Sequence, residues 1–209
     1  MNRFTPRLTA SLLVTLLAVC CLTAAPAVQA DESQGLPVMT QLPEFFLIDH
    51  QGKPFTRRNL AGSAWIFDFI FTRCAGPCPV MTSKLGELQR KLADVSGLRL
   101  ASVSVDPEHD TPAVLVAYGR EAGADLARWS FLTGSKEGIF KLSRKGFLLG
   151  VEEEGNGGAG SAAPTTLHST TFTLVDGQGY IRGYYDSGDR EALGRLTADA
   201  RALAAGESR

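Results

Sequence analysis

The sequence predicts an α/β protein, a three-layer sandwich with a central mixed sheet and flanking helices. Two apolar runs of strand length, at 64–71 and 98–105, are nearly continuous, which is typical of strands buried on both faces of a mostly parallel sheet. Apolar residues at helical spacing follow the first run, and a helix start follows the second. Near the C-terminus, two strand-like segments flank a short turn and predict a hairpin. Alternating strands and helices, then a hairpin and a last helix, favour this sandwich.

The first part of the domain is expected to hold two strands and a helix. An apolar run at 45–48 ends in Asp-His-Gln-Gly-Lys, which is typical of a strand and turn. The run at 64–71 (AWIFDFIF) predicts a buried strand. A helix is predicted over 79–95, because Pro79 suits a first helical turn and Met81 opens an apolar stripe. We therefore expect Met81 to lie in the core rather than on a metal.

The second part supplies the remaining elements. A strand is expected at 98–105, and the loop after it ends where Thr111 caps a helix that begins at Pro112. A glycine-rich stretch at 152–166 (EEEGNGGAGSAAPTT) lacks bulky residues and predicts a mobile surface loop. The other predicted elements are helix 112–121, strand 129–132, helix 136–145, strands 171–175 and 180–184, and helix 189–205.

Length and composition indicate one globular domain. The chain has 209 residues, of which 44% are hydrophobic and 21% charged, enough to bury a sizeable core. Its formal net charge of −1 gives no basic surface of the kind that binds nucleic acid. We expect a single domain over residues 31–209.

The first 30 residues have the pattern of an export signal. Arg3 and Arg7 precede an apolar stretch at 8–22, and Val-Gln-Ala ending at Ala30 resembles a cleavage site. Two alternatives stay open. The segment remains as a membrane anchor, since it approaches the ~20 residues that span a bilayer, or Cys20 carries a lipid. Each of them places the domain outside the cytoplasm, in the periplasm or at the outer face of the inner membrane, and any membrane contact would come through this uncleaved segment.

The chemistry of the chain is concentrated in the sequence Cys74-Ala-Gly-Pro-Cys78-Pro. Cleavage of the signal would remove Cys20 and Cys21 and leave these two cysteines. A disulfide between them closes too short a loop to remove much chain entropy, which disfavours a purely structural bridge. They stand between a buried strand and a helix start, where the helix dipole favours thiolates. Such a pair can hold a soft metal ion or exchange electrons as a dithiol and disulfide, and the spacing leaves both open.

Four segments together resemble the Sco/SenC family, a branch of the thioredoxin superfamily. They are FTRCAGPCP at 71–79, SVDPEHDTP at 104–112, HST at 168–170, and LVD with GYIR within 174–182. The resemblance spans about residues 44–205 and implies a thioredoxin-like fold. It also implies a copper chaperone for cytochrome c oxidase.

The family binds copper through two thiolates and one imidazole, so the resemblance implies Cys74, Cys78 and His168 as ligands. Soft sulfur donors suit Cu(I), and an imidazole adds affinity for Cu(II). The implied partner is the oxidase subunit that carries the binuclear copper centre, besides other copper or thiol-redox proteins. His168 follows the glycine-rich stretch, so we expect it to move off the metal during delivery. This stretch is longer than the family leads us to expect, which would loosen the histidine and weaken copper binding.

An alternative function is that of an enzyme, a thiol-disulfide oxidoreductase acting on the copper-site cysteines of the oxidase or on other exported proteins. Cys74 would attack and Cys78 would resolve the mixed disulfide. Asp68 would relay protons, because a carboxylate in so apolar a strand should be buried with a raised pKa, and thioredoxins place one at the same distance before their first cysteine. Asp68 has a second interpretation, as a side chain hydrogen-bonded at a sheet end or facing a wet pocket. A peroxidase of the peroxiredoxin branch ranks last, because only Thr72 and Arg73 resemble its site.

Three further polar residues have interpretations of their own. Asp106 either orders the loop before Pro107 or contacts a partner. His50 is expected to be solvated in a turn, and His109 has no assigned role. His168 distinguishes the copper chaperone from the thiol-disulfide oxidoreductase, because a copper site uses its imidazole and a dithiol reductase does not need it.

Overall fold

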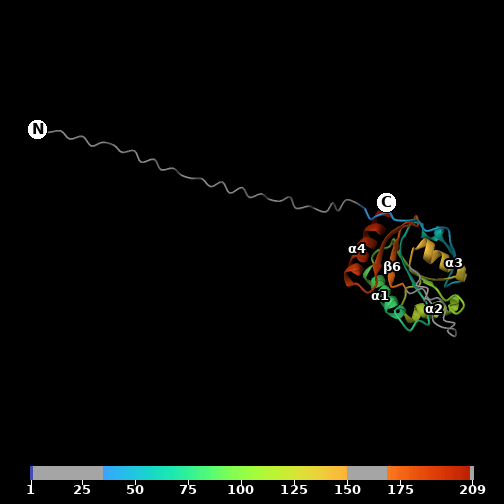
Figure 1. Cartoon of the computed structure of the whole chain (residues 1–209). Helices are drawn as coiled ribbons and strands as arrows, with labels where there is room; N and C mark the ends of the chain where they lie inside the picture. The colour runs from blue at the N-terminus through green and yellow to red at the C-terminus, as the bar shows by residue number, and fades with distance from the viewer. Residues whose placement is uncertain (2–34, 150–168, 208–209) are drawn as a thin grey trace, which may run out of the picture. The chain divides into compact units, whose positions relative to one another are not determined.

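A seven-stranded mixed sheet forms the centre of the computed structural model, which describes Met1, residues 35–149 and residues 169–207 (Figure 1). The strands are β1 (Phe46–Asp49), β2 (Pro54–Thr56), β3 (Ala64–Ile70), β4 (Leu98–Ser104), β5 (Trp129–Thr133), β6 (Thr171–Val175) and β7 (Ile181–Asp186). The helices are α1 (Cys78–Lys91), α2 (Pro112–Glu121), α3 (Lys136–Lys141) and α4 (Arg190–Glu207), with helical turns η1 (Arg57–Leu60) and η2 (Leu142–Gly146).

The order of the strands in the sheet is β2-β1-β5-β4-β3-β6-β7. β3, β4 and β5 are parallel to one another, and the remaining pairs are antiparallel. β3 is thus an interior strand, which explains its continuous run of hydrophobic residues, because both of its faces are covered. The predicted sandwich with a mixed sheet is confirmed.

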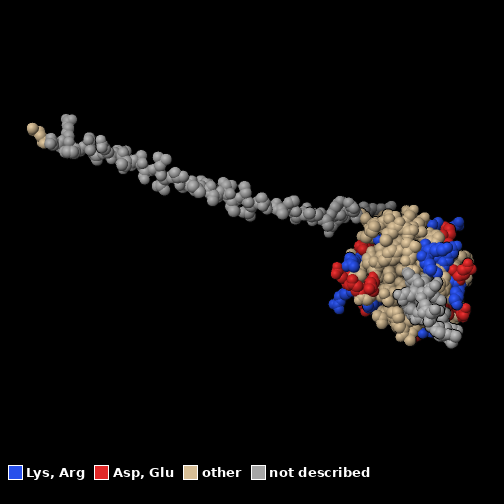
Figure 2. Space-filling view, in the orientation of Figure 1, with Lys and Arg blue, Asp and Glu red and all other residues tan. Residues whose placement is uncertain are grey.

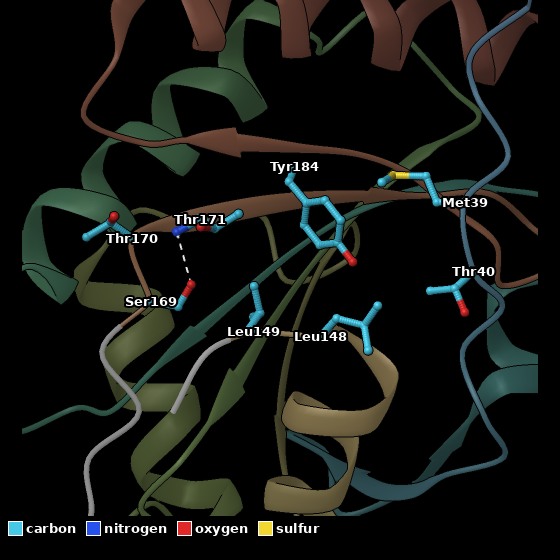
Figure 3. Close-up of a pocket in the computed structure, with 8 residues that line it drawn as sticks. All are labelled: Met39, Thr40, Leu148, Leu149, Ser169, Thr170, Thr171 and Tyr184. Atoms are coloured by element: carbon cyan, nitrogen blue, oxygen red, sulfur yellow. Dashed lines mark hydrogen bonds between the residues drawn. The ribbon is translucent and has the colours of Figure 1, made fainter. Parts of the chain in front are cut away.

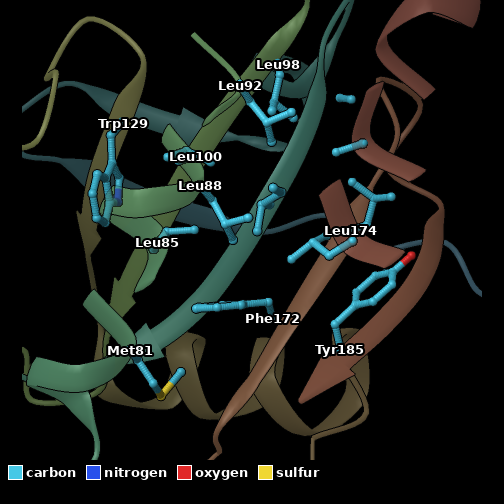
Figure 4. Close-up of a cluster of buried hydrophobic side chains, with 14 of the residues drawn as sticks. Met81, Leu85, Leu88, Leu92, Leu98, Leu100, Trp129, Phe172, Leu174 and Tyr185 are labelled. Atoms are coloured by element: carbon cyan, nitrogen blue, oxygen red, sulfur yellow. The ribbon is translucent and has the colours of Figure 1, made fainter. Parts of the chain in front are cut away.

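Side chains from alternate positions of β3 enter two different cores. Ile66 and Ile70 face the layer made by α1, α2 and α4, whereas Phe67 and Phe69 face α3 and η2. Figure 4 shows the first core, in which one face of α1 points at the sheet. Met81 is 1% exposed in this core, as predicted. Its buried residues include Met81, Leu85, Leu88, Leu92, Leu98, Leu100, Trp129, Phe172 and Leu174.

Two differences from the predicted elements have local causes. The helix expected over 136–145 is α-helical only to Lys141 and continues as a wider π-helical turn, in which the Phe147 amide donates to the Leu142 carbonyl at 2.9 Å. The short strand β2 and the turn η1 were not predicted. β2 has three residues, too few for a periodic pattern, and forms by antiparallel pairing with β1.

Some of the predicted features lie outside the described residues. These are the export signal or anchor at 1–30, the glycine-rich stretch at 152–166, and His168. Within the described ranges, none of the helices has the length and hydrophobicity that crossing a membrane requires.

Charged side chains of both signs are spread over the face seen in Figure 2, and Lys and Arg gather over α3 and η2. A cavity on that surface is lined by Lys141, Arg144 and Lys145, together with Glu137. The two cysteines are buried and lie at another place in the fold, where β3 ends and α1 begins.

Candidate functional site

Cys74 and Cys78 lie on the short connection between β3 and α1, and both are free thiols. Cys74 is 8% exposed and its sulfur accepts a hydrogen bond from the Gly76 amide at 3.3 Å. Cys78 is the first residue of α1 and is 5% exposed, with Pro79 in the first turn as predicted. The two sulfurs are near enough to interact, since Cys74 affects the pKa of the Cys78 thiol at the start of α1.

Burial decides the acidity of the Cys78 thiol in the metal-free, reduced protein. Loss of water raises the pKa of Cys78 to about 12, and the neighbouring Cys74 sulfur adds to the effect, whereas a backbone hydrogen bond with Phe71 opposes it. Burial of Cys78 and the neighbouring sulfur therefore act against the thiolate that the helix start was expected to favour. A soft cation that replaces the proton would reverse this balance, because a metal-bound thiol is deprotonated.

The arm that leads into Cys74 is tied to the loop after β4. The carboxylate of Asp110, which is completely buried, accepts from the Thr72 amide at 3.0 Å and from the Thr72 hydroxyl at 2.5 Å. The Ser104 hydroxyl donates to the same carboxylate at 2.5 Å. Two of these three bonds hold Thr72, two positions before Cys74, and the third holds the Asp110 carboxylate itself.

Asp106 joins the same arm through an ion pair. Its carboxylate accepts from Arg73 at 2.7 Å, next to Cys74, and its carbonyl accepts from the amides of His109 and Asp110. Of the two interpretations of Asp106, the contacts favour the one that orders the loop.

Asp68 lies on β3, six residues before Cys74 in the sequence, and is fully buried. Neither carboxylate oxygen has a hydrogen-bond partner of good geometry in the described part of the chain, although Ser102 is its register partner on β4. Burial raises the pKa of Asp68 to about 7, and the nearby Ser102 hydroxyl acts in the opposite direction. A charge on Asp68 also raises the pKa values of Cys78 and Tyr118, so these groups are within electrostatic reach of one another. The prediction that this carboxylate is buried with a raised pKa is confirmed.

A family model described as SCO1/SenC matches residues 36–204 of this sequence.

This chain belongs to the Sco/SenC family.

Relatives of this Sco protein cover most of its length. A SCO1 protein homolog of Bacillus subtilis is 29% identical over 167 residues, which are 79% of this chain and 83% of the relative. BsSco, a member of the Sco family of cytochrome c oxidase assembly proteins in which a disulfide switch was identified, has a structure similar to this one with a TM-score of 0.68. It is 28% identical, and the match covers 82% of this chain and 98% of BsSco.

A relative was solved with its metal. The crystal structure of Arabidopsis thaliana ScoI with copper bound matches at a TM-score of 0.63 and 25% identity, covering 78% of this chain and 99% of that one. The fold of this Sco protein is therefore thioredoxin-like, as the resemblance implied.

The predicted third ligand, His168, lies outside the described residues. The described chain resumes at Ser169 and enters β6, which is antiparallel to β3 with Phe67 opposite Thr173. The start of β6 therefore lies beside the end of β3, where the strands leave the same side of the sheet. Among the described residues, no group of three His, Cys, Asp or Glu side chains is arranged to hold a metal ion.

A cavity of about 620 Å³ lies between the start of β6 and the turn after η2 (Figure 3). Leu148 and Met39, which are 60% and 52% exposed, line it, and Leu148 has a left-handed backbone with φ of 51°. Leu149 and Ser169, which flank the segment 150–168, also line this cavity. Leu149 and Ser169 are therefore close together.

His50 contradicts its prediction. It is 7% exposed rather than solvated, and its Nδ1 accepts from the Phe131 amide at 3.2 Å. Burial lowers the pKa of His50, and nearby Asp49 opposes the change. This contact joins the turn after β1 to β5, so His50 has a structural role beside the sheet.

Sequence reasoning missed Asp110, Thr72 and Ser104. A signal was present, because Asp110 is the second aspartate of the Asp-Pro-Glu-His-Asp-Thr-Pro segment. The prediction fell instead on the first aspartate, Asp106, whose side chain is partly buried and pairs with Arg73.

Proposed function

We propose that this Sco protein is a copper chaperone, which binds a copper ion as cargo through Cys74 and Cys78 and passes it to the binuclear copper centre of cytochrome c oxidase. The observation that carries the proposal is the pair of free, buried thiols at the start of α1. Thiolates are soft donors and select Cu(I). Copper bound to Arabidopsis ScoI and the oxidase-assembly family of BsSco support the metal and its destination.

His168 is the third ligand in this proposal. Support comes from its neighbour Ser169, which leads into β6 at the sheet edge where β3 ends and the cysteine loop begins. An imidazole added to two thiolates accommodates Cu(II) as well as Cu(I). Delivery would proceed by ligand exchange, in which sulfur ligands of the acceptor replace those of the chaperone, and the domain would act outside the cytoplasm.

An anaerobic Cu(I) titration of the reduced domain, from Asp31 onward, against a competing chelator tests the proposal. We expect tight one-to-one binding in the wild type, loss of it in Cys74→Ser and weaker binding in His168→Ala. His109→Ala is the matched control, because it removes an imidazole from the loop after β4. Weak wild-type binding would exclude the chaperone. Equal binding by the two histidine variants would exclude His168 as a ligand.

A second candidate function is favoured by Asp68. A buried, unpaired carboxylate beside a dithiol is the arrangement in which a thiol-disulfide oxidoreductase moves protons, with Cys74 as nucleophile and Cys78 as resolving thiol. The disulfide switch of BsSco supports a redox role for this cysteine pair. The pH dependence of thiol alkylation in Asp68→Asn tests the relay. We expect the wild-type profile to show a step near pH 7 that is absent from the Asp68→Asn profile. The same profile in both proteins would exclude a relay through Asp68.

A further inference from the structure

We propose that Asp110 is a positioning residue for Cys74. Through its hydrogen bonds to Thr72, Asp110 holds the Cys74 sulfur close to the Cys78 sulfur. This inference rests on the proposed function, because the spacing of the sulfurs matters for a copper or disulfide site. Asp110 lies on the loop after β4, and its carboxylate bonds to Thr72 and Ser104 rather than to either sulfur.

The bonding of Asp110 is directed at the cysteine arm. Its two oxygens accept three hydrogen bonds, and two of the donors belong to Thr72, one from the backbone and one from the side chain. A carboxylate oxygen accepts hydrogen bonds, and here two hydroxyls and one amide supply the donors, with the Arg73 guanidinium within electrostatic reach. Because Asp110 is completely inaccessible to water, loss of a donor cannot be replaced by solvent without opening the site.

The other side of Cys74 offers much less restraint. Ala75 and Gly76 are exposed, and the Gly76 amide donates to the Cys74 sulfur itself. Cys78, in contrast, is fixed by its place as the first residue of α1, whose next turn is packed in the core. The separation of the two sulfurs therefore depends on the preceding arm, where Thr72 is bound.

Holding two thiols close raises the concentration of one at the other, which favours both their disulfide and a shared metal ion. Release of the arm should therefore lower both the stability of the disulfide and the affinity of the pair for a metal ion. The redox readout is independent of copper. The Cys74–Cys78 dithiol gives two electrons and two protons to glutathione disulfide, which forms two molecules of glutathione, and the equilibrium constant of this exchange measures how well the thiols are paired.

Thr72→Val removes the hydroxyl and keeps the branched shape and the amide. We expect its equilibrium constant for oxidation to fall about tenfold, which raises the reduction potential by about 30 mV. Thr72→Ser keeps the hydroxyl and should stay within about twofold of the wild type. Asp110→Asn replaces one of the two acceptor oxygens by a donor that faces other donors, so it should shift the equilibrium in the same direction and at least as far.

Thr197→Val is the matched control, since Thr197 is a part-buried threonine of α4 whose hydroxyl donates to the Leu193 carbonyl at 2.7 Å. It should leave the equilibrium constant unchanged. Folded Thr72→Val protein with the wild-type constant would overturn the proposal, and so would an equal shift in Thr197→Val. The Cu(I) affinity of the same variants is measured separately. If the wild type binds no copper, the chaperone function fails, while the redox equilibrium still decides the role of Asp110.

Discussion

Asp68 is a single carboxylate in a strand of hydrophobic residues, and its environment gives the fold a pH dependence. The pKa of Asp68 is about 7 in the folded protein, against an ordinary value of 3.8. The folded state therefore binds more protons than the unfolded state between these pH values, and the free energy of unfolding falls as the pH rises through this window. The difference corresponds to at most about 4 kcal/mol above pH 7.

Asp68→Asn should remove that dependence. We expect the variant to gain stability relative to the reduced wild type as the pH rises from about 5 to 8, because an amide carries no charge to bury. Urea denaturation at a series of pH values measures the difference, in which titrations of other groups, such as His50, cancel. If the free energy of unfolding changed with pH in the same way in both proteins, ionisation of Asp68 would not destabilise the fold.

Cys78 should be an unreactive thiol in the metal-free domain. In Cys74→Ser protein at pH 7 to 8, iodoacetamide should modify Cys78 at least about a hundredfold more slowly than in urea, because burial raises the pKa of this thiol and excludes the reagent. The time course of alkylation, followed by mass spectrometry with and without urea, gives the ratio. Equal rates would mean that the loop around Cys78 is open in solution.

The sequence allowed single residues to be predicted where their neighbours along the chain set their environment. Asp68 was recognised as buried because the residues around it in β3 are apolar, and Met81 because of its helical stripe. His50 and Asp110 were not recognised. Their partners Phe131 and Thr72 are 81 and 38 positions away, so no local pattern records these contacts.

Helix packing can be tested at two glycines in different helices. A Cβ at Gly119 in α2 would lie 2.7 Å from Phe131 and 3.0 Å from Leu126, whereas one at Gly194 in α4 meets nothing within 4 Å. Gly119→Ala should destabilise the protein by about 1–3 kcal/mol through overpacking. Gly194→Ala should stabilise it by about 0.5–1 kcal/mol, because alanine favours the helix. Urea denaturation measures both, and the same sign for both variants would contradict the packing of α2 on β5.

Elements with a long or strongly patterned sequence were predicted well. β3, β4 and α2 match their predicted ranges within one residue, because a continuous apolar run or a Thr-Pro start defines them. β2 was missed since pairing with β1, rather than its own sequence, makes it a strand. The π-helical turn η2 was missed for a similar reason, because apolar spacing does not distinguish it from the end of an α-helix.

The described N-terminal segment, residues 35–42, is held on the rest of the molecule by Arg182. The guanidinium donates to the carbonyls of Leu36 at 2.6 Å and Pro37 at 3.0 Å, and pairs with Asp176 at 2.9 Å. The Arg182 and Asp176 side chains are 16% and 6% exposed, so this is a largely buried ion pair. Removing one partner of such a pair leaves the other without compensation.

Arg182→Ala should therefore cost about 3 kcal/mol and release the segment. Hydrogen exchange of the Met39 amide, which donates to the Ile181 carbonyl, should accelerate more than that of amides in β4. Arg195→Ala is the control, because its pair with Glu191 is exposed and should contribute less than about 1 kcal/mol. Equal exchange at Met39 in wild type and Arg182→Ala would show that the backbone bonds alone hold the segment.

The fold class could be predicted for the whole molecule, but the order of strands could not. Alternating strands and helices indicate a layered sheet, and they leave open which strands are neighbours. Here β3 lies between β4, its successor in sequence, and β6, from which it is separated by most of the domain. The placement of Ser169 beside the cysteine edge depends on that long-range pairing.

Synthesis order sets how long the two thiols stay unprotected. A chain grows from its N-terminus, so the loop with Cys74 and Cys78 is made long before β6 and α4, whose residues close the core around it. Until β6 and α4 are made, one side of β3 has no neighbouring strand, and the core that contains the two cysteines is incomplete. Newly made molecules thus pass through an interval in which oxidants, stray metal ions and other cysteines compete for the pair, and the last strands and helix to form end that interval.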